Sequence, residues 1–255
     1  MSDILTHQDA GVMTITFNRL DKKNAITGAM YALLANAIEH AQNTDSVKVV
    51  VLQGHETIFT AGNDISDFLH RPRTSNESPA MDFLHNISTC TKPIVASVCG
   101  PAVGIGTTML MHCDLVYAGD NAAFALPFVN LGLCPEAASS WLVPQMMGYP
   151  RAAEALLLGE PFMAEAALEV GLVNRVVAPN EANNLANAIA QKLAKKPISA
   201  LIETKRLMKK NQMGIVQSTM KEELVSFGRM LHEPAAKEAF GAFLEKRKPD
   251  FSKIN

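Results

Sequence analysis

Two short runs of mostly β-branched residues constrain the fold of this chain more than any other feature. Residues 47–52 and 94–99 are rich in valine and isoleucine, and their length and branching predict strands that are buried. Each run is followed by a turn that contains glycine, "FTAGNDI" at 59–65 and "GPAVGIGTTM" at 100–109. The pattern therefore predicts two buried strands, each leading into a glycine turn.

The remaining apolar periodicity divides the chain into two parts. Strands and helices alternate in the first part, whereas beyond residue 182 the apolar residues keep helical spacing only. Further strands are predicted at 12–17, 115–118, 123–125 and 173–177, and helices after Thr27, at 107–113, at 164–170 and throughout the C-terminal part, where the last begins at Pro234. We therefore expect an α/β fold with a strand–helix core over residues 1–195 and a helical region over residues 196–255.

Charge and composition exclude several classes of function. Charged residues make up 19% of the chain and the net charge is −2, so no bulk field would attract nucleic acid. No apolar run approaches the ~18 residues that span a bilayer, and the first residues lack the basic and apolar segments of a signal peptide. We expect a cytoplasmic protein without a bound metal. Its cysteines are expected to be reduced thiols, at Cys90, Cys99, Cys113 and Cys134.

The two glycine turns can each present one backbone donor. Gly62 permits a conformation in which the N–H of Asn63 faces a cleft, and Gly104 and Gly106 flank Ile105 where a helix begins. Two such donors that converge on one oxygen form an oxyanion hole, in which each contributes roughly 3–4 kcal/mol. Each turn taken alone also has a structural explanation. The first could be a plain turn before a capped helix, and the glycines of the second could allow tight packing of strand on helix. A dinucleotide fingerprint does not fit, because its third glycine is missing.

Six motifs, in this order and at these spacings, extend over nearly the whole chain. They are "NRLDKKNAIT", "FTAGNDI", "GPAVGIGTTMLMHCDLVYAG", "AAFALPFVNLGLCPE", "EAALEVGLVNRVV" and "FLEKRKPDF". The set resembles the enoyl-CoA hydratase/isomerase superfamily, which has the crotonase fold. The resemblance implies a spiral of ββα turns, and a C-terminal helical region that mediates a homotrimer or a dimer of trimers. It also implies an acyl-CoA thioester substrate, with coenzyme A as part of the substrate and no separate cofactor.

The resemblance assigns binding roles by position. The N–H groups of Asn63 and Ile105 resemble the oxyanion hole for the thioester carbonyl. The loop that cradles the nucleotide and pantetheine corresponds to residues 22–25, and the thioester end to residues 61–65. Lys246 and Lys248 resemble the basic end of a tail that approaches a CoA phosphate of the same or a neighbouring subunit. The implied substrate-binding residues are Lys22, Lys23, Ala25, Ala61, Gly62, Asn63, Asp64, Ile65, Ile105, Lys246 and Lys248.

The carboxylates decide which reaction the resemblance favours. Hydratases of the family use two glutamates, and Thr108 and Phe128 stand at those positions here. Glu136 remains, in an apolar loop, and resembles the single catalytic glutamate of peroxisomal-type Δ3,Δ2-enoyl-CoA isomerases. A solvated loop residue is the plain alternative. With one acid, Glu136 would remove a proton from C2 of a 3-enoyl-CoA and return it at C4.

The sequence leaves other functions possible. The chain could be a slow hydratase, or a dienoyl-CoA isomerase, although the latter would need a second acid in the pocket. It could also be an acyl-CoA binding member without catalysis. Asp64 is expected to cap a helix, and His112, in an apolar segment, to be a hydrogen-bonded core residue.

Overall fold

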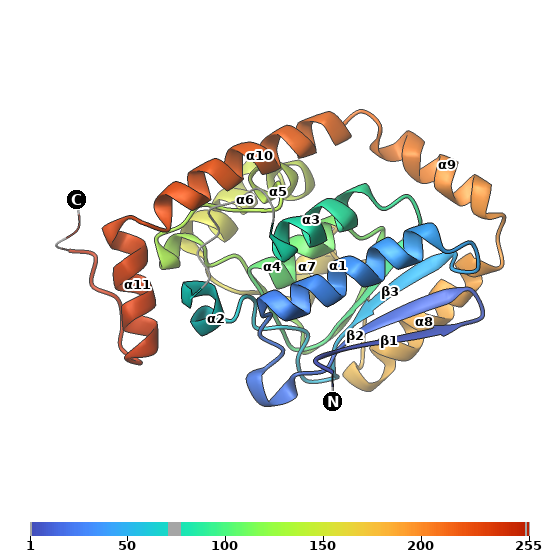
Figure 1. Ribbon diagram of the computed structural model, residues 1–255, viewed down its shortest axis with the longest axis horizontal. Helices are drawn as coiled ribbons and strands as arrows, with labels where there is room; N and C mark the ends of the chain where they lie inside the picture. The colour runs from blue at the N-terminus through green and yellow to red at the C-terminus, as the bar shows by residue number, and fades with distance from the viewer. Residues whose placement is uncertain (1, 71–77, 253, 255) are drawn as a thin grey trace.

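The protein forms one mixed α/β body with a long helical extension (Figure 1). The computed structural model describes residues 2–70, 78–252 and 254. None of the described helices is long and apolar enough to cross a membrane. The predicted α/β class is confirmed, and so is the helical C-terminal region. The division into parts at residue 195 stays a prediction.

The main sheet has six strands in the order β1-β2-β3-β4-β6-β9. Only β1 and β2 pair antiparallel, and every other neighbouring pair is parallel. The strands are β1 (Ile4–Asp9), β2 (Val12–Phe17), β3 (Val49–Gln53), β4 (Ile94–Val98), β6 (Leu115–Gly119) and β9 (Arg175–Val177). The two runs rich in valine and isoleucine are the central strands β3 and β4, and their side chains are accordingly buried on both faces of the sheet. Strand β1 was not predicted, since only Ile4 of its residues is buried.

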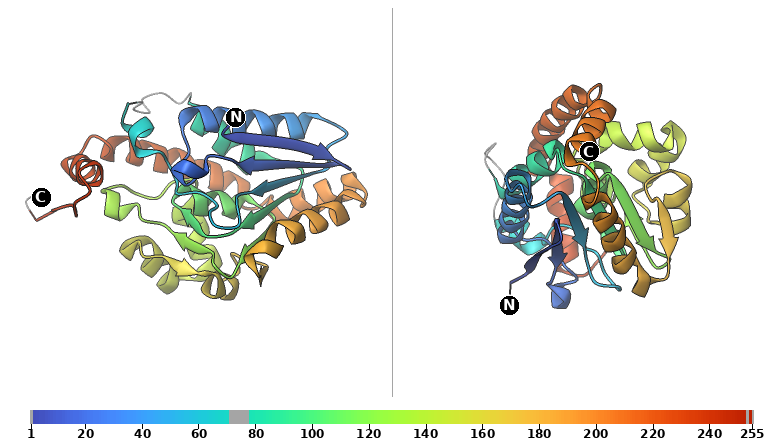
Figure 2. Two further views of the ribbon diagram at one scale, coloured as in Figure 1. Left: turned by 90° about the horizontal axis from the view of Figure 1, so that it is seen from below. Right: turned by 90° about the vertical axis from the view of Figure 1, so that its right-hand side faces the viewer.

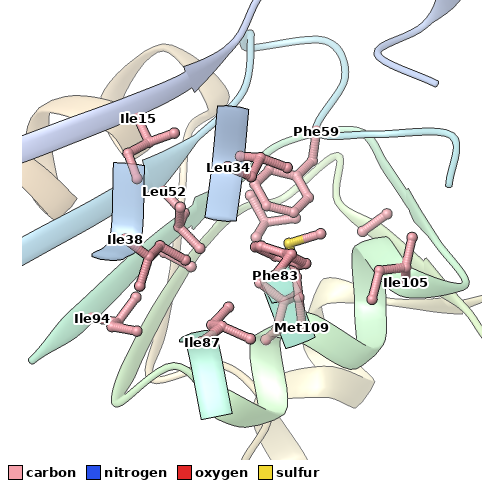
Figure 3. Packing of buried hydrophobic residues seen from close by; sticks show 14 of the residues in the cluster. Ile15, Leu34, Ile38, Leu52, Phe59, Phe83, Ile87, Ile94, Ile105 and Met109 are labelled. Carbon is pink, nitrogen blue, oxygen red and sulfur yellow. The ribbon is translucent and has the colours of Figure 1, made fainter. Parts of the chain in front are cut away.

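Helices cover both faces of this sheet. On one face, α1 (Gly28–Asn43) and α3 (Pro79–Thr89) pack on each other and on the strands, where Leu34, Phe83 and Leu52 meet in the core (Figure 3). Thr27 accepts a hydrogen bond from Met30 N at 3.2 Å and caps α1 as predicted. On the other face lies α8 (Pro179–Ala194), whose alanines recur every four residues and allow close approach to the strand valines.

A second, smaller sheet carries the segment that leads into the glycine-rich turn. It contains β5 (Pro101–Val103), β7 (Ala123–Ala125) and β8 (Phe162–Met163). The helix predicted at 107–113 is a short α-helix, α4 (Ile105–Thr108), continued by a 3₁₀ turn, η2 (Met109–His112). The remaining elements before the C-terminal part are the 3₁₀ helices η1 (Leu20–Lys22) and η3 (Val129–Leu131), the π-helix η4 (Glu154–Leu158) and the helices α2 (Ile65–His70), α5 (Ser139–Met147), α6 (Tyr149–Ala153) and α7 (Ala164–Glu169).

Three helices form the C-terminal extension. They are α9 (Ile198–Lys209), α10 (Met213–Met230) and α11 (Pro234–Leu244). Helices α9 and α11 lie at opposite ends of the molecule, with α10 between them, and α11 and the C-terminus stand apart from the main sheet (Figures 1 and 2). Several large apolar side chains of this extension are exposed, at Leu207, Met208, Val225, Phe243 and Leu244.

Candidate active site

The two glycine turns lie directly against each other. Thr60 donates its N–H to Pro101 O at 3.1 Å and accepts at its own carbonyl from Val103 N at 3.1 Å. A Cβ on Gly62 would lie 2.7 Å from Val103 O, and one on Gly106 would lie 2.6 Å from Thr60 Cγ2. The glycines are therefore required where the turns touch, which supports the packing explanation. The convergence of two donors on one oxygen stays a prediction.

The first turn is anchored from within the core. Gly62 has a φ of +86°, in the region that glycine adopts without strain. Its N–H donates to Thr60 Oγ1 at 3.1 Å. The Asn63 side-chain oxygen accepts from the Tyr31 hydroxyl of α1 at 2.6 Å. These bonds set the direction of the peptide between Gly62 and Asn63.

The second turn places Ile105 at the start of α4. Gly104 precedes it with a φ of +56° and occupies the N-cap position. The Ile105 side chain is 2% exposed and packs into the main core, near Phe83 and Met109 (Figure 3). The first N–H groups of a helix have no intrahelical acceptor, so the backbone at this point is suited to hold a carbonyl oxygen.

A cavity of about 640 Å³ opens beside both turns. Its wall includes all the predicted substrate-binding residues of the two turns and of the 22–25 loop: Lys22, Lys23, Ala25, Ala61, Gly62, Asn63, Asp64, Ile65 and Ile105. Apolar side chains line it as well, at Phe128, Leu131, Leu133, Phe227, Phe240, Phe243 and Leu244. Apolar walls with lysines among the lining residues suit an apolar ligand with an anionic end.

Lys246 and Lys248 do not line this cavity among the described residues, although Phe243 and Leu244 just before them do. Both lysines are exposed beyond the end of α11. Their predicted approach to a CoA phosphate therefore stays a prediction.

Asp64 caps a helix, as predicted. Its Oδ1 accepts from Asp67 N at 3.1 Å and from the Ser66 hydroxyl at 2.7 Å, at the start of α2. Its Oδ2 accepts from Arg19 at 2.7 Å in an ion pair. Burial opposes ionisation of Asp64, but the hydrogen bonds from Ser66 and Arg19 outweigh burial and lower its pKa to about 2. Such a carboxylate is a poor proton acceptor.

Glu136 contacts the second glycine turn through a hydrogen bond with Thr108. The Thr108 hydroxyl donates to Glu136 Oε1 at 2.6 Å. Thr108 is fully buried and closes the helical turn that Ile105 begins, so the carboxylate contacts the same four-residue helix. Glu136 is partly buried and is not among the described residues that line the cavity. Phe128, at the position of the second hydratase acid, does line it.

The backbone after Glu136 is held by two buried side chains. His112 donates from Nε2 to Ala137 O at 2.9 Å, and burial lowers its pKa to about 4, so it is a neutral core residue as predicted. Glu223 of α10 accepts from Ala138 N at 2.6 Å and from Ser140 N at 2.9 Å. Glu223 was not predicted as a functional residue. A carboxylate at helical spacing with Met220 and Phe227, on an otherwise apolar face, was the available signal.

Comparison with known proteins places this site in a family. The sequence profile of enoyl-CoA hydratase/isomerase matches residues 7–254. The chain belongs to the enoyl-CoA hydratase/isomerase family. The predicted crotonase-type fold is confirmed by solved members. A crystal structure of an enoyl-CoA hydratase/isomerase from Pseudoalteromonas atlantica T6c superposes with a TM-score of 0.93 at 38% identity, covering 98% of this chain and 100% of that one.

The family relatives differ in their reactions. Enoyl-CoA delta isomerase 2 of Rattus norvegicus is 36% identical over 86% of this chain, which spans only 58% of the length of that relative. The 2,3-dehydroadipyl-CoA hydratase of Escherichia coli is 30% identical over 98% of this chain and 99% of its own length. Membership of the enoyl-CoA hydratase/isomerase family is therefore compatible with either an isomerase or a hydratase.

Proposed function

We propose that the protein is a Δ3,Δ2-enoyl-CoA isomerase, which converts 3-enoyl-CoA to 2-trans-enoyl-CoA. The observation that carries this proposal is the Thr108–Glu136 hydrogen bond at 2.6 Å. The bond holds one carboxylate beside Thr108, which by the resemblance occupies the position of the first acid of a family hydratase, while Phe128 occupies that of the second. One acid is sufficient to move a proton but leaves no partner for the addition of water.

In this mechanism the thioester carbonyl accepts hydrogen bonds from the N–H groups of Asn63 and Ile105. Glu136, as carboxylate, removes a proton from C2, and the C–H electron pair moves into a dienolate whose charge lies on the thioester oxygen. The two backbone donors stabilise that oxyanion. Glu136, now protonated, delivers the proton to C4, and the double bond moves to C2–C3. Water takes no part, so the apolar cavity wall favours the reaction.

The cavity lining supports an acyl-CoA thioester as the substrate. We propose that Lys22, Lys23 and Ala25 contact the nucleotide and pantetheine, and that residues 61–65 contact the thioester end. Lys246 and Lys248 are proposed to reach a CoA phosphate of the same or a neighbouring subunit. Coenzyme A enters as part of the substrate, so no separate cofactor is required. We assign the reaction to the β-oxidation of unsaturated fatty acids.

A hydratase is the second candidate, because the Escherichia coli hydratase matches over almost its full length. An acyl-CoA binding member without activity is the third. Intact glycine turns together with Glu136 argue against it, since binding alone would not need a carboxylate bonded to Thr108 of α4.

The deciding assay follows formation of the conjugated 2-enoyl thioester from a 3-enoyl-CoA. We expect turnover in the wild-type protein, and at least a ~10²-fold lower kcat in Glu136→Gln, the loss typical of a missing acid–base group. Glu165→Gln, at an exposed position of α7, is the matched control and should keep the wild-type rate. Full activity in Glu136→Gln would refute the assignment. Hydration of crotonyl-CoA at comparable efficiency would favour the hydratase, and acyl-CoA binding without either reaction would favour the third candidate.

A further inference from the structure

The turn after Glu136 has a backbone conformation that is unfavourable for alanine. Ala137 and Ala138 have φ values of +61° and +58°, both in the left-handed region. For a residue with a Cβ this conformation costs roughly 1–2 kcal/mol. Two such residues in succession persist only where the surrounding structure holds them. The catalytic candidate Glu136 immediately precedes them, so whatever holds this turn also directs its side chain.

The groups that hold the turn converge on one carboxylate. Glu223 Oε2 accepts from Ala138 N at 2.6 Å, and Oε1 accepts from Ser140 N at 2.9 Å and from the Ser140 hydroxyl at 2.5 Å. Both oxygens of Glu223 are therefore committed to residues 138–140. The chain separates the two partners by 85 residues, so only the fold brings them together.

Packing alone does not explain Glu223, because burying its carboxylate costs free energy. The residue is 6% exposed, and among the described residues it forms no ion pair. Burial raises its pKa, against the hydrogen bonds from Ser140 and Ala138, which favour the carboxylate. A buried carboxylate without a cation is costly, and an apolar side chain would fill the same space at lower cost. A specific requirement for two acceptors at this turn explains its presence.

Three hydrogen bonds hold Glu136, two at its main-chain carbonyl and one at its carboxylate. The Glu136 carbonyl accepts from Ser139 N at 3.1 Å and from the Ser139 hydroxyl at 2.6 Å. Its carboxylate accepts from Thr108. The position of Glu136 therefore depends on the Ala137–Ala138 turn, which follows it in the chain, and on α4, which its carboxylate contacts.

We propose that Glu223 is the positioning residue of Glu136, an inference that rests on the proposed isomerase function. Helix α10, which packs on α5, carries Glu223 and, one turn later, Phe227 in the cavity wall (Figure 1). The C-terminal helical region thereby holds the catalytic turn as well as part of the substrate cavity. Glu223 is bonded to the backbone of residues 138 and 140, directly after Glu136, so it would act through Glu136 and contribute little to acyl-CoA binding.

The test is a double-mutant cycle between Glu223 and Glu136. We expect Glu223→Gln to lower kcat by about 10–100-fold with KM within about twofold, because a misplacement of about 1 Å can cost 10²-fold. In the Glu136→Gln background the same change should lower the residual rate no further. Ser140→Ala, which removes one donor to Glu223 at an exposed position, should show a smaller loss of kcat with the same dependence on Glu136.

Glu222→Gln, on the exposed side of the same helix, is the matched control and should keep both kcat and the thermal midpoint. An equal fold-loss from Glu223→Gln in both backgrounds would mean a merely structural role and would overturn the inference. Wild-type kcat in Glu223→Gln would overturn it as well. If circular dichroism shows that Glu223→Gln does not fold, the test rests on Ser140→Ala, and a wild-type kcat in that variant would overturn the inference. An inactive wild type, or a fully active Glu136→Gln, would instead refute the proposed function.

Discussion

At the residue scale, burial decides the chemistry of each polar side chain around Glu136. His112 and Asp64 have side chains that can transfer protons, but the sequence predicted a core residue and a helix cap for them. In the fold His112 is a neutral donor within the core, and Asp64 is an ion-paired cap with a pKa of about 2. Glu136 is partly buried and contacts the helix that begins at Ile105. Asp64 lines the cavity but is committed to Arg19 and to the cap of α2, whereas the carboxylate of Glu136 contacts α4 through Thr108.

The pKa of His112 predicts a component of acid instability. It falls from 6.5 to about 4 on folding because the ring is buried. Between these pH values the unfolded chain binds a proton that the folded protein excludes, so the free energy of unfolding decreases as the pH falls through this window. At about 1.4 kcal/mol per pH unit, the decrease between pH 7 and pH 4.5 is roughly 2–3 kcal/mol.

His112→Gln should lack this component, as measured by urea unfolding at the two pH values. His85→Gln, at an exposed position, should retain it. The same pH dependence in His112→Gln as in the wild type would show that another group is responsible.

At the element scale, a buried ion pair fixes α9 to the main sheet. Lys205 is the buried residue of this helix, and its ammonium donates to Asp114 at 2.7 Å and to Lys92 O at 2.8 Å. Asp114 in turn accepts from Ile94 N, at the start of β4, at 2.8 Å. Polar contacts thus hold a helix whose apolar side chains Leu207 and Met208 are exposed.

Lys205→Met should destabilise the protein by about 3 kcal/mol. The substitution leaves the partly buried Asp114 without its nearest cation, and removing one partner of a buried pair costs about 3–5 kcal/mol. We place the loss at the lower end because Lys209 lies 3.7 Å from the other Asp114 oxygen. Urea unfolding measures the change, with the exposed Lys210→Met as control. Equal stability of the two variants would contradict the role of this pair.

At the scale of the whole molecule, the C-terminal extension exposes apolar surface that one chain leaves uncovered. Leu207 and Met208 of α9 and Val225 of α10 are 47%, 67% and 73% exposed. Exposed apolar side chains on the helices of an extension are typical of surfaces that pair with another subunit. The resemblance predicted a homotrimer or a dimer of trimers, and this surface is consistent with that assembly.

We therefore expect a solution mass of three or six times the 27.6 kDa chain by sedimentation velocity. Val225→Asp should shift the mass towards the monomer, because it introduces a charge into an apolar contact. Glu222→Gln on the same helix should leave the mass unchanged. A monomeric wild-type protein at micromolar concentration would contradict the prediction.

The elements that could be predicted were those with a strong local pattern. Strands β2, β4, β6 and β7 appear where the alternation or the β-branched runs placed them, and the cap at Thr27 is present. Strands β3 and β9 begin two residues later than expected, at Val49 and Arg175. Strands β5 and β8 have too few residues for a periodic signal, and β1 exposes nearly all its side chains. The helices α3, α5 and α6 were also not predicted.

The sequence by itself determined the α/β class, the two glycine turns and the cavity-lining residues at positions 22–25 and 61–65, and it predicts Glu136 as the catalytic carboxylate. All of these depend on neighbours within a few residues or on motif order. Only the tertiary structure decided that Thr60 joins the turns, that Thr108 binds Glu136 and that Glu223 holds the Ala137–Ala138 turn. These contacts join segments far apart in the chain, and their energies depend on burial and distance, which exist only once the chain has folded.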